Sequence, residues 1–582
     1  MKKKSDTKQV LKRLLKYIKP YRASLIVALI CALISVSLSL LTPILIGNAV
    51  DHIIGKGKVE FDKILPILLY LSLCIGGSAL FQWLMTFCTN QITFKTIKDL
   101  RNQLFQKLEK VPISYIDGNS HGNIINRMVN DIDAVSDGLL QGFAGLFTGI
   151  ITIFGTIIFM LSINVRIAMA VILITPLSLF VAAFISKRIY NKFSEQSKLK
   201  GEMGGLIEEM IGNQKLVKLL SYEDRSKERF EEINQRLHEC GTQAQFYSSL
   251  TNPCTRFVNG VVYATVGIYG ALTAIGGFIT IGQLSGFLAY ANQYTKPFNE
   301  ISGIVTELQS ALASAQRVFA LLDEEEESKE DGLLEEAFGS GTVEISKVDF
   351  SYQKEHKLIQ DFNIKVKAGQ RIAIVGPTGS GKTTIINLLM RFYESDSGEI
   401  LVNGIDIKKM KRRTLRSLYG MVLQDSWLFQ GTVSENIAYG KEGATREEII
   451  LAAKAAHAHS FIKRLPKGYD TVLTEDGGNI SQGQKQLLCI ARVMLMKPSM
   501  LILDEATSNI DTRTEVKIQK AFGALMEGRT SFVVAHRLST IRESDLILVM
   551  NNGQIVEQGN HEELLNFNGF YANLYHSVDK ME

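Results

Sequence analysis

The sequence lacks several features that would point to common functions. Its six cysteines among 582 residues are scattered and include no C-x-x-C pair, which argues against a zinc site or a disulfide framework. The formal net charge is only +5, so bulk charge gives no indication of nucleic-acid binding. A cleavable signal peptide is not expected, because the first apolar run is too long for one. The cysteines are therefore interpreted as reduced packing residues.

Long apolar runs without a charged residue occur in the first part of the chain. Each provides the ~20 apolar residues that a helix needs to cross a ~30 Å hydrocarbon core. The last run is too long for one helix, and Gly276 and Gly277 offer a turn inside it. We therefore expect six membrane spans, drawn from the runs 23–50, 64–94, 138–165, 167–186 and 257–295.

Lysine and arginine are concentrated at the N-terminus and in two long segments, 96–137 and 187–256. The segments on the opposite side are short, so this bias predicts a cytoplasmic-membrane protein with both termini in the cytosol. Residues 10–21 are interpreted as a basic amphipathic helix on the inner membrane surface, or as a solvated charged arm. The two long segments are helical in pattern and are interpreted as docking elbows for a cytosolic domain, or as plain hairpins.

Six polar side chains fall within the expected spans. Arg256 is the costliest, since an arginine at membrane depth costs roughly 2.5–3.5 kcal/mol on insertion scales. It lies near a helix end, so it either faces a cavity on the substrate pathway or extends to the membrane interface. The others are Gln82, Asn259, Gln283, Asn292 and Gln293.

An apolar strand at residues 371–375 leads into a glycine-rich loop and an apolar helix. The loop fits G-x-x-x-x-G-K-[ST], a pattern in which backbone N–H groups wrap phosphate oxygens. Lys382 is placed to reach the outer phosphates, and the Thr383 hydroxyl is placed to bind Mg²⁺. The nucleotide-binding residues expected here are Gly376, Pro377, Thr378, Gly379, Ser380, Gly381, Lys382, Thr383 and Thr384.

A second apolar strand ends on two acids, Asp504 and Glu505. Asp504 is placed to hold Mg²⁺, directly or through water. Glu505 is the better candidate for orienting and deprotonating an attacking water. A third apolar strand ends at His536, and a histidine in such a place is by itself more often structural.

These patterns predict a multi-domain fold in which an all-α membrane domain precedes an α/β domain. Residues 1–322 form a six-span transmembrane domain with long cytosolic helical extensions. Residues 323–340 form an acidic linker that we expect to be mobile. Residues 341–582 form an α/β P-loop nucleotide-binding domain.

The motifs resemble those of an ATP-binding cassette (ABC) exporter, in which six spans are fused to one nucleotide-binding domain. The resemblance implies that Tyr352, in FSY, stacks on adenine. It implies that Gln424, in VLQDSWLF, senses Mg²⁺ and takes part in catalysis. It also implies that His536 is a catalytic switch residue that contacts the γ-phosphate.

GGNISQGQ is similar to the family's signature, which closes on ATP held by the opposite subunit. The residues implied to bind that ATP are Ser481, Gly483 and Gln484, together with Asp511 in the loop that crosses the dimer interface. Since the chain has one phosphate loop and one signature, the resemblance implies that a second half-transporter chain completes each site.

This signature departs from the family's usual Leu-Ser-Gly-Gly-Gln. Ile480 replaces leucine and Gln482 replaces the first glycine, which adds bulk beside a backbone that must approach phosphate closely. We therefore expect a weakened site and favour a heterodimer, with this chain as its catalytically competent half. A homodimer that tolerates Gln482 at both sites is the alternative.

The resemblance implies ATP-driven export of an amphiphilic substrate by alternating access. ATP and Mg²⁺ are the implied cofactors. The implied partners are the bilayer and a small amphiphile, such as a drug-like compound, a lipid or a peptide. A membrane ATPase that signals or remodels without transport is a rival of a different class. An importer is less favoured, since importers usually keep the two domains on separate chains.

Overall fold

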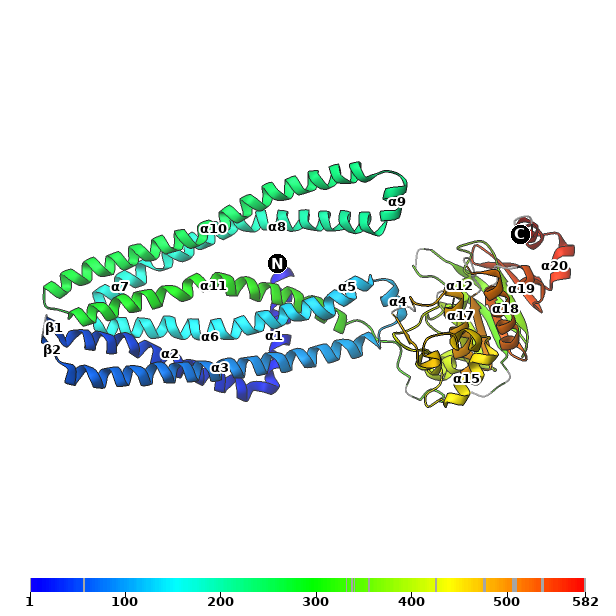
Figure 1. The fold of residues 1–582 in the computed structure, drawn as a ribbon, viewed down its shortest axis with the longest axis horizontal. Coiled ribbons are helices and arrows are strands. Elements are labelled where there is room, and N and C mark those ends of the chain that lie inside the picture. Colours follow the sequence, from blue (N-terminus) through cyan, green and yellow to red (C-terminus); the bar gives the residue numbers. More distant parts are fainter. Residues whose placement is uncertain are drawn as a thin grey trace. The chain divides into compact units, whose positions relative to one another are not determined.

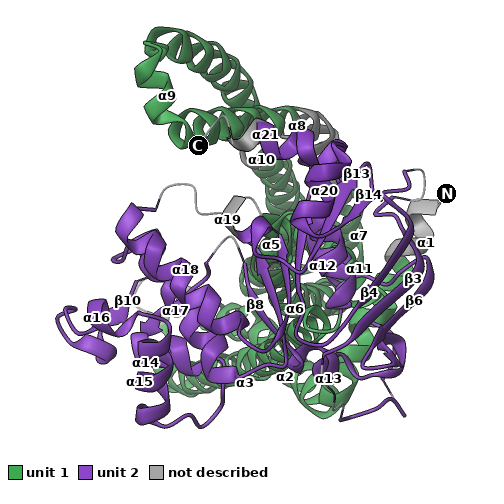
Figure 2. Cartoon of the chain, turned by 90° about the vertical axis from the view of Figure 1, so that its right-hand side faces the viewer, with its two compact units in different colours: residues 1–110, 119–325 green, residues 111–118, 326–582 purple. Residues whose placement is uncertain are grey.

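The computed structural model describes residues 2–55, 58–330, 332–336, 339, 341–353, 356–423, 426–474, 478–504, 510–534 and 538–579. The chain divides into two compact units, which Figure 2 distinguishes by colour. Unit 1 contains Met1–Lys110 and Asn119–Glu325, and unit 2 contains Val111–Gly118 and Glu326–Glu582.

Unit 1 is built almost entirely from long helices (Figure 1). A short antiparallel pair, β1 with β2, follows the first long helix. The elements of unit 1 are α1 (Lys2–Ile18), η1 (Lys19–Tyr21), α2 (Arg22–Asp51), β1 (Ile53–Gly55), β2 (Lys58–Val59), α3 (Phe61–Leu108), α5 (His121–Asn126), the π-helical η2 (Arg127–Asp131), α6 (Ile132–Ile163), α7 (Val165–Ile174), α8 (Pro176–Gly212), α9 (Gln214–Leu219), α10 (Glu223–Ile275) and α11 (Ile281–Leu322).

Within the described residues, four helices are long and apolar enough to cross a membrane. They are Lys8–Asp51, Phe61–Leu108, His121–Ile163 and Glu223–Ile275, and Val165–Ile174 is a shorter apolar helix. The expected count of six spans stays a prediction. The turn expected at Gly276 and Gly277 is confirmed, because α10 ends at Ile275, α11 begins at Ile281 and Gly277 has a φ of +73°.

The helices continue well beyond their apolar runs, as the two long basic segments predict. An ion pair fixes two of these extensions to each other. Arg317 of α11 donates from Nε to Oδ2 of Asp131 at 2.9 Å, and the Asp131 side chain is buried. Because a buried carboxylate needs a partner, this pair holds α11 against the π-helical turn that precedes α6.

Unit 2 is an α/β domain to which one short element from the first basic segment is added. Its elements are α4 (Ile113–Asp117), β3 (Val343–Phe350), β4 (Ile359–Val366), β5 (Arg371–Val375), α12 (Lys382–Leu389), β6 (Ser397–Val402), β7 (Ile405–Asp406), η3 (Ile407–Lys409), α13 (Arg412–Ser417), β8 (Tyr419–Val422), β9 (Gly431–Thr432), α14 (Val433–Ala438), α15 (Arg446–Ala455), α16 (His459–Ile462), η4 (Gly468–Asp470), β10 (Val472–Leu473), α17 (Gln482–Met496), β11 (Met500–Asp504), α18 (Thr512–Met526), β12 (Thr530–Val534), α19 (Leu538–Arg542), β13 (Leu546–Asn551), β14 (Gln554–Gly559), α20 (His561–Phe567) and α21 (Phe570–Asp579).

The centre of unit 2 is a six-stranded sheet in the order β14-β13-β5-β12-β11-β8. Its strands are parallel except for β14, which pairs antiparallel with β13. A separate antiparallel sheet has the order β4-β3-β6-β7. Along β5, Ile372 and Ile374 pack into one hydrophobic core while Ala373 and Val375 pack into the other. Burial on both faces explains why this strand is apolar from Ile372 to Val375.

Candidate nucleotide site

The expected phosphate loop lies at the carboxyl end of β5, inside the central sheet. Residues 376–381 connect β5 to α12, which starts at Lys382. Gly376 and Gly381 have φ values of +156° and +99°, and a Cβ on Gly376 would lie 2.2 Å from the backbone oxygen of Met550. Only glycine fits such a position. The structure therefore explains the glycines of the motif by the path of the backbone.

Lys382 is the charged group of this loop. Its side chain is buried, and Nζ donates to the carbonyl oxygens of Gly376 at 2.8 Å and Pro377 at 3.0 Å. Burial lowers the pKa of Lys382, and the nearby Asp504 carboxylate opposes that shift. The ammonium thus lies folded back over its own loop.

The loop residues fit a bound polyphosphate. The Ser380 Oγ is buried and has no hydrogen-bond partner among the described residues, although a buried hydroxyl normally has one. Thr383 is exposed at the first turn of α12, where its hydroxyl is free to reach a ligand. A buried cation, an unpartnered hydroxyl and a helix N-terminus together provide donors for anionic oxygens.

The acid predicted to hold a metal lies beside the loop. Asp504 is the last residue of β11, and its register partner on β12 is Val534. Val534 in turn pairs with Ile374 of β5. The carboxyl ends of these parallel strands therefore meet at one edge of the sheet, next to residue 376. Glu505, His536 and Gln424, which follow β11, β12 and β8 in the sequence, lie outside the described residues.

The predicted adenine-stacking residue, Tyr352, is half exposed next to α12. Its hydroxyl lies 3.3 Å from the Thr384 hydroxyl and accepts from Asn387 at 3.1 Å. Its ring lies edge-on to Tyr393, with the ring centroids 4.9 Å apart. The Tyr352 ring also lies edge-on to Phe350, with the centroids 4.9 Å apart, and the residue remains 48% exposed.

Tyr393 connects this aromatic cluster to the first docking elbow. Its hydroxyl donates to the Asp117 carboxylate of α4 at 2.5 Å. Burial and this hydrogen bond raise the pKa of Tyr393, so its hydroxyl remains a donor at neutral pH. The interpretation of segment 96–137 as a docking elbow is supported, because α4 belongs to unit 2. Sequence reasoning missed Tyr393, which carries no motif.

The signature residues form the N-terminus of α17. Ser481 caps the helix, with its Oγ accepting from the Gln484 N–H and the Gln484 Oε1 accepting from the Ser481 N–H. Gly483 is buried, and a Cβ there would lie 2.5 Å from Cγ2 of Thr514. Gln482, by contrast, is exposed. The unusual glutamine therefore fits this fold without strain and presents its side chain outward.

Asp511 caps the neighbouring helix, α18, by accepting from the Thr514 N–H at 2.9 Å. Hydrogen bonds from Thr514 lower the pKa of Asp511. In the described part of the chain, no hydrogen bond or ion pair joins Ser481, Gln484 or Asp511 to the phosphate loop. The predicted site thus exists as two separate halves.

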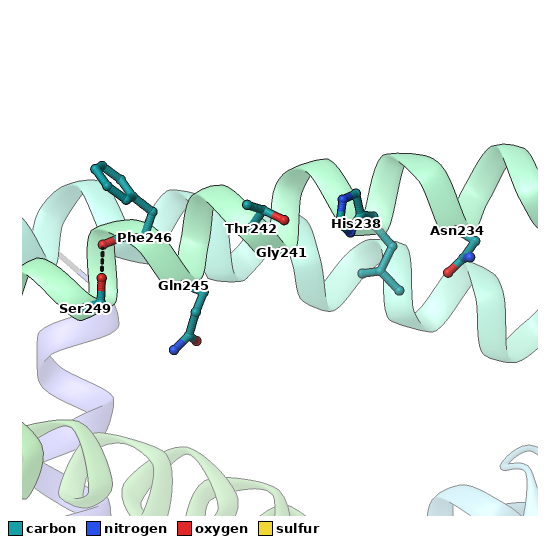
Figure 3. A pocket seen from close by; sticks show the side chains of 8 residues that line it. Asn234, His238, Gly241, Thr242, Gln245, Phe246 and Ser249 are labelled. Carbon is teal, nitrogen blue, oxygen red and sulfur yellow. Dashed lines mark hydrogen bonds between the residues drawn. The ribbon is translucent and has the colours of Figure 1, made fainter.

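An open cavity of about 620 Å³ runs along α10 in unit 1, and Figure 3 shows its lining side chains. All of them belong to that one helix. They are Asn234, Leu237, His238, Gly241, Thr242, Gln245, Phe246 and Ser249. Because ligand pockets are concave and bury most of the ligand, this surface is a poor candidate for substrate.

A second cavity, of about 610 Å³, lies among α2, α3, α6 and α11. It brings together Gln82 and Gln293, two of the polar residues that the sequence placed within spans. Arg256 is exposed and does not line it, nor do Asn259, Gln283 and Asn292. Lys296 and Glu300 do line it, although sequence reasoning ended the last span before them.

Comparison with known proteins identifies both parts of the chain. The ABC transporter transmembrane region family matches residues 25–298, and the ABC transporter family matches residues 359–508. The uncharacterized ABC transporter ATP-binding protein YfiC of Bacillus subtilis (strain 168) is 42% identical over 577 residues, 99% of this chain and 95% of YfiC.

Two further similarities extend over nearly the whole chain. The fatty acid ABC transporter ATP-binding/permease protein of Mycobacterium bovis is 43% identical over 528 residues, 91% of this chain and 82% of that protein. The solved structure of a bacterial Atm1-family ABC exporter with ATP bound has a TM-score of 0.80 and 28% identity, covering 96% of this chain and 99% of that one.

Proposed function

Because the chain belongs to the ABC transporter family, with transmembrane and ATP-hydrolysing domains on one polypeptide, we propose that it exports an amphiphilic substrate across the cytoplasmic membrane. The observation that carries the proposal is the phosphate loop, with buried Lys382 and the unpartnered Ser380 hydroxyl, in a chain that matches both family models. Residues 1–322, 323–340 and 341–582 serve as transmembrane domain, linker and ATP-binding domain.

The residues of unit 2 have complementary roles in this proposal. Lys382, Ser380 and the loop N–H groups bind the outer phosphates of ATP, and Tyr352 stacks on adenine. Thr383, Asp504 and Gln424 hold Mg²⁺, which supplies charge neutralisation when it is bound. Glu505 orients and deprotonates the attacking water, and His536 contacts the γ-phosphate. The attraction between the Asp504 carboxylate and Lys382, which opposes the lowering of the Lys382 pKa, supports a shared phosphate and metal site.

A second half-transporter chain completes each site. Ser481, Gly483, Gln484 and Asp511 then bind nucleotide held by the partner's phosphate loop. Two features of the described residues support a partner. In the described residues, no hydrogen bond or ion pair joins Ser481, Gln484 or Asp511 to this chain's own phosphate loop. Three leucines of the second elbow (Leu216, Leu219 and Leu220) are exposed. An elbow that docks on a partner would cover these leucines.

The substrate is proposed to be an amphiphile with an alkyl chain. The Mycobacterium bovis relative is named as a fatty acid transporter, and the cavity of unit 1 combines apolar and polar side chains. A membrane ATPase that signals without transport is the alternative. It has no comparable support, because the named relatives are transporters.

Transport by reconstituted protein tests the proposal. The chain, with any partner that co-purifies, is placed in liposomes that contain fluorescent acyl-chain probes. ATP is expected to move at least one probe, and the Glu505→Gln variant is expected not to. Steady ATP hydrolysis without movement of any probe would instead support the signalling ATPase.

A further inference from the structure

The cavity of about 610 Å³ in unit 1 lies among helices that pack side by side in the bundle (Figure 1). α2, α3, α6 and α11 all contribute to its wall. Lys296 and Glu300 line it from α11, one helical turn apart. The cavity is thus polar and charged within helices that are otherwise apolar.

Lys296 lies deeper in the membrane than Glu300. At ~1.5 Å per residue, Lys296 is roughly 22 Å along α11 from Ile281, and Glu300 is roughly 28 Å along it. With the turn before Ile281 at the outer surface, Lys296 falls inside a ~30 Å hydrocarbon core and Glu300 falls at its cytosolic border. Both side chains are exposed, and along α11 the carboxylate lies one turn nearer the cytosolic rim of the cavity than the ammonium.

Lys296 has no ion-pair or hydrogen-bond partner among the described residues, Glu300 included. A charge at membrane depth is costly unless it meets a counter-charge or water. An anion in the cavity would supply that counter-charge. The amide of Gln293 points to the same conclusion, because its Oε1 is buried without a partner and the amide is free to turn its N–H₂ group to a ligand.

Three of the hydroxyls that line the cavity already donate to the backbone. Thr42 donates to Leu38, Thr148 donates to Ala144, and Ser35 donates to Ser78 across the α2–α3 contact. Their protons are committed to backbone oxygens. Among the described lining residues, Lys296, the glutamine amides and the hydroxyls of Ser39 and Thr152 therefore remain as donors for a ligand, and Lys296 is the only cation among them.

Part of the cavity lining is apolar. This part, which we call the apolar wall, comes from three helices and consists of Val36 and Leu40 of α2, Ile75 and Ala79 of α3, and Pro297 of α11. An alkyl chain fits such a wall because burial of its methylenes is favourable by about 0.8 kcal/mol each. The anion-binding group and the apolar wall thus belong to one site.

We propose that this cavity binds an amphiphile with a single anionic headgroup, a carboxylate or a phosphate monoester, placed on Lys296 with its alkyl chain along Val36 and Ile75. The inference rests on the proposed function, since it names the substrate class of the same transporter. Glu300 at the rim disfavours an anion there and so directs the headgroup inward.

Equilibrium binding to the full chain in phosphatidylcholine nanodiscs tests the inference. The probes are radiolabelled laurate, dodecyl phosphate and dodecyltrimethylammonium, and empty nanodiscs correct for partition into lipid. Wild type is expected to bind both anions at least ~10-fold more tightly than the cation. Lys296→Gln is expected to lose most of this preference, Lys296→Arg to retain it, and Glu300→Gln to bind laurate more tightly.

Two results would overturn the inference. One is equal binding of laurate by Lys296→Gln and Lys296→Arg, with both variants eluting as folded protein. The other is a wild-type preference for the cation. ATP-driven movement of uncharged acyl probes by wild type is measured in parallel. If these probes are moved, the transporter proposal stands even when the anion-site inference fails, because transport can persist without anion selectivity.

Discussion

Gln482 and Gly483 are neighbours in the signature, yet the fold treats them differently. The Gln482 side chain is exposed, whereas Gly483 is buried against α18. The second glycine is therefore required by packing within this chain. The first position is constrained only by whatever approaches the helix from outside. Position 483 is therefore constrained by folding, whereas the adjacent position 482 is constrained by binding.

Gly483→Ala is expected to lower the stability of unit 2 by about 1–3 kcal/mol, because the added methyl overpacks the contact with α18. Its Cβ would lie 2.5 Å from Thr514 Cγ2 and 3.0 Å from Ile510 Cγ2. Thermal unfolding of the full chain measures the loss. The matched control is Gln482→Ala at the exposed neighbour, which is expected to change stability by less than about 0.5 kcal/mol. Equal effects of the two changes would contradict this account.

Glu505→Gln is expected to leave ATP binding intact and to lower steady-state hydrolysis by about 10²-fold or more. The residue follows Asp504 directly in the sequence, and Asp504 lies at the sheet edge that carries the phosphate loop, where a water-orienting group is needed. Binding of a fluorescent ATP analogue and phosphate release measure the two effects separately. Hydrolysis within a few-fold of wild type would remove Glu505 from this role.

The strand, glycine-rich loop and helix at residues 371–389 and the place of Asp504 at the end of β11 were predictable from sequence, because local patterns encode them. Gly376 and Lys382 lie within one strand–loop–helix unit, so their spacing is enough. Tyr393 and Lys296 were not predictable. Tyr393 acts through a contact with Asp117, which is remote in sequence, and Lys296 depends on four helices enclosing a cavity. Tertiary contacts of this kind leave no periodic or motif signal.

At the scale of elements, the acidic linker differs from its sequence-based expectation of mobility. Arg391 and Arg412 are both buried at the surface that the linker crosses. Arg412 donates to Glu330 Oε1 at 3.0 Å and to Ser328 Oγ at 2.8 Å, and Arg391 also donates to Ser328. Buried guanidinium groups need charged or polar partners, and the linker provides them. The acidic residues of the linker therefore serve to bind it to the buried arginines of unit 2.

Arg412→Ala is expected to release the linker and to cost about 1–3 kcal/mol, since it leaves the bound groups unsatisfied. Hydrogen exchange across residues 326–336 measures the release directly. Arg413→Ala is the matched control, because Arg413 is adjacent and exposed. Unchanged exchange in Arg412→Ala, or the same increase in both variants, would show that the linker does not depend on this arginine.

The same contact has a defined dependence on pH. Burial alone would raise the pKa of Glu330, but hydrogen bonds from Arg412 and the attraction of Arg412 and Arg391 lower it overall. Because the pKa of Glu330 is lower in the folded state, the stabilisation that Glu330 gives to the linker contact is complete above the ordinary glutamate pKa. It is lost as the pH falls through the lowered value. In wild type, the protection of the linker from hydrogen exchange is therefore expected to weaken only when the pH is lowered. In Arg412→Ala, the linker is expected to show no such loss of protection on acidification.

For the whole molecule, the proposed orientation predicts which segments can be labelled from outside the cell. The basic segments favour a cytosolic N-terminus, and the β1–β2 turn then faces outward. An impermeant thiol reagent is applied to intact cells that carry Ser5→Cys or Gly57→Cys in a cysteine-free background. We expect labelling at residue 57 and none at residue 5 until the cells are opened. The reverse pattern would overturn the topology.

The two halves of the ATP site in unit 2 match the family pattern unequally, and this difference predicts which type of dimer the chain forms. The phosphate loop, Asp504 and the sequence positions of Glu505 and His536 match the family pattern, whereas the signature carries Gln482. Since Gln482 is exposed, its bulk does not strain this chain, and we expect it to act on a bound partner. A heterodimer tolerates the substitution, because the altered signature can face a partner loop that barely hydrolyses ATP.

We therefore expect the working unit to contain a different chain, one with an intact signature and a substitution at the position matching Glu505. A tagged copy purified from native membranes identifies co-purifying chains by mass spectrometry. ATP hydrolysis and transport in nanodiscs and liposomes are then compared for this chain alone and for the co-expressed pair, with Gln482→Gly tested in both. In the pair, Gln482→Gly is expected to change turnover by no more than a few-fold, because the competent site uses the partner's signature. A stable, fully active assembly of this chain alone, accelerated by Gln482→Gly, would instead establish the homodimer.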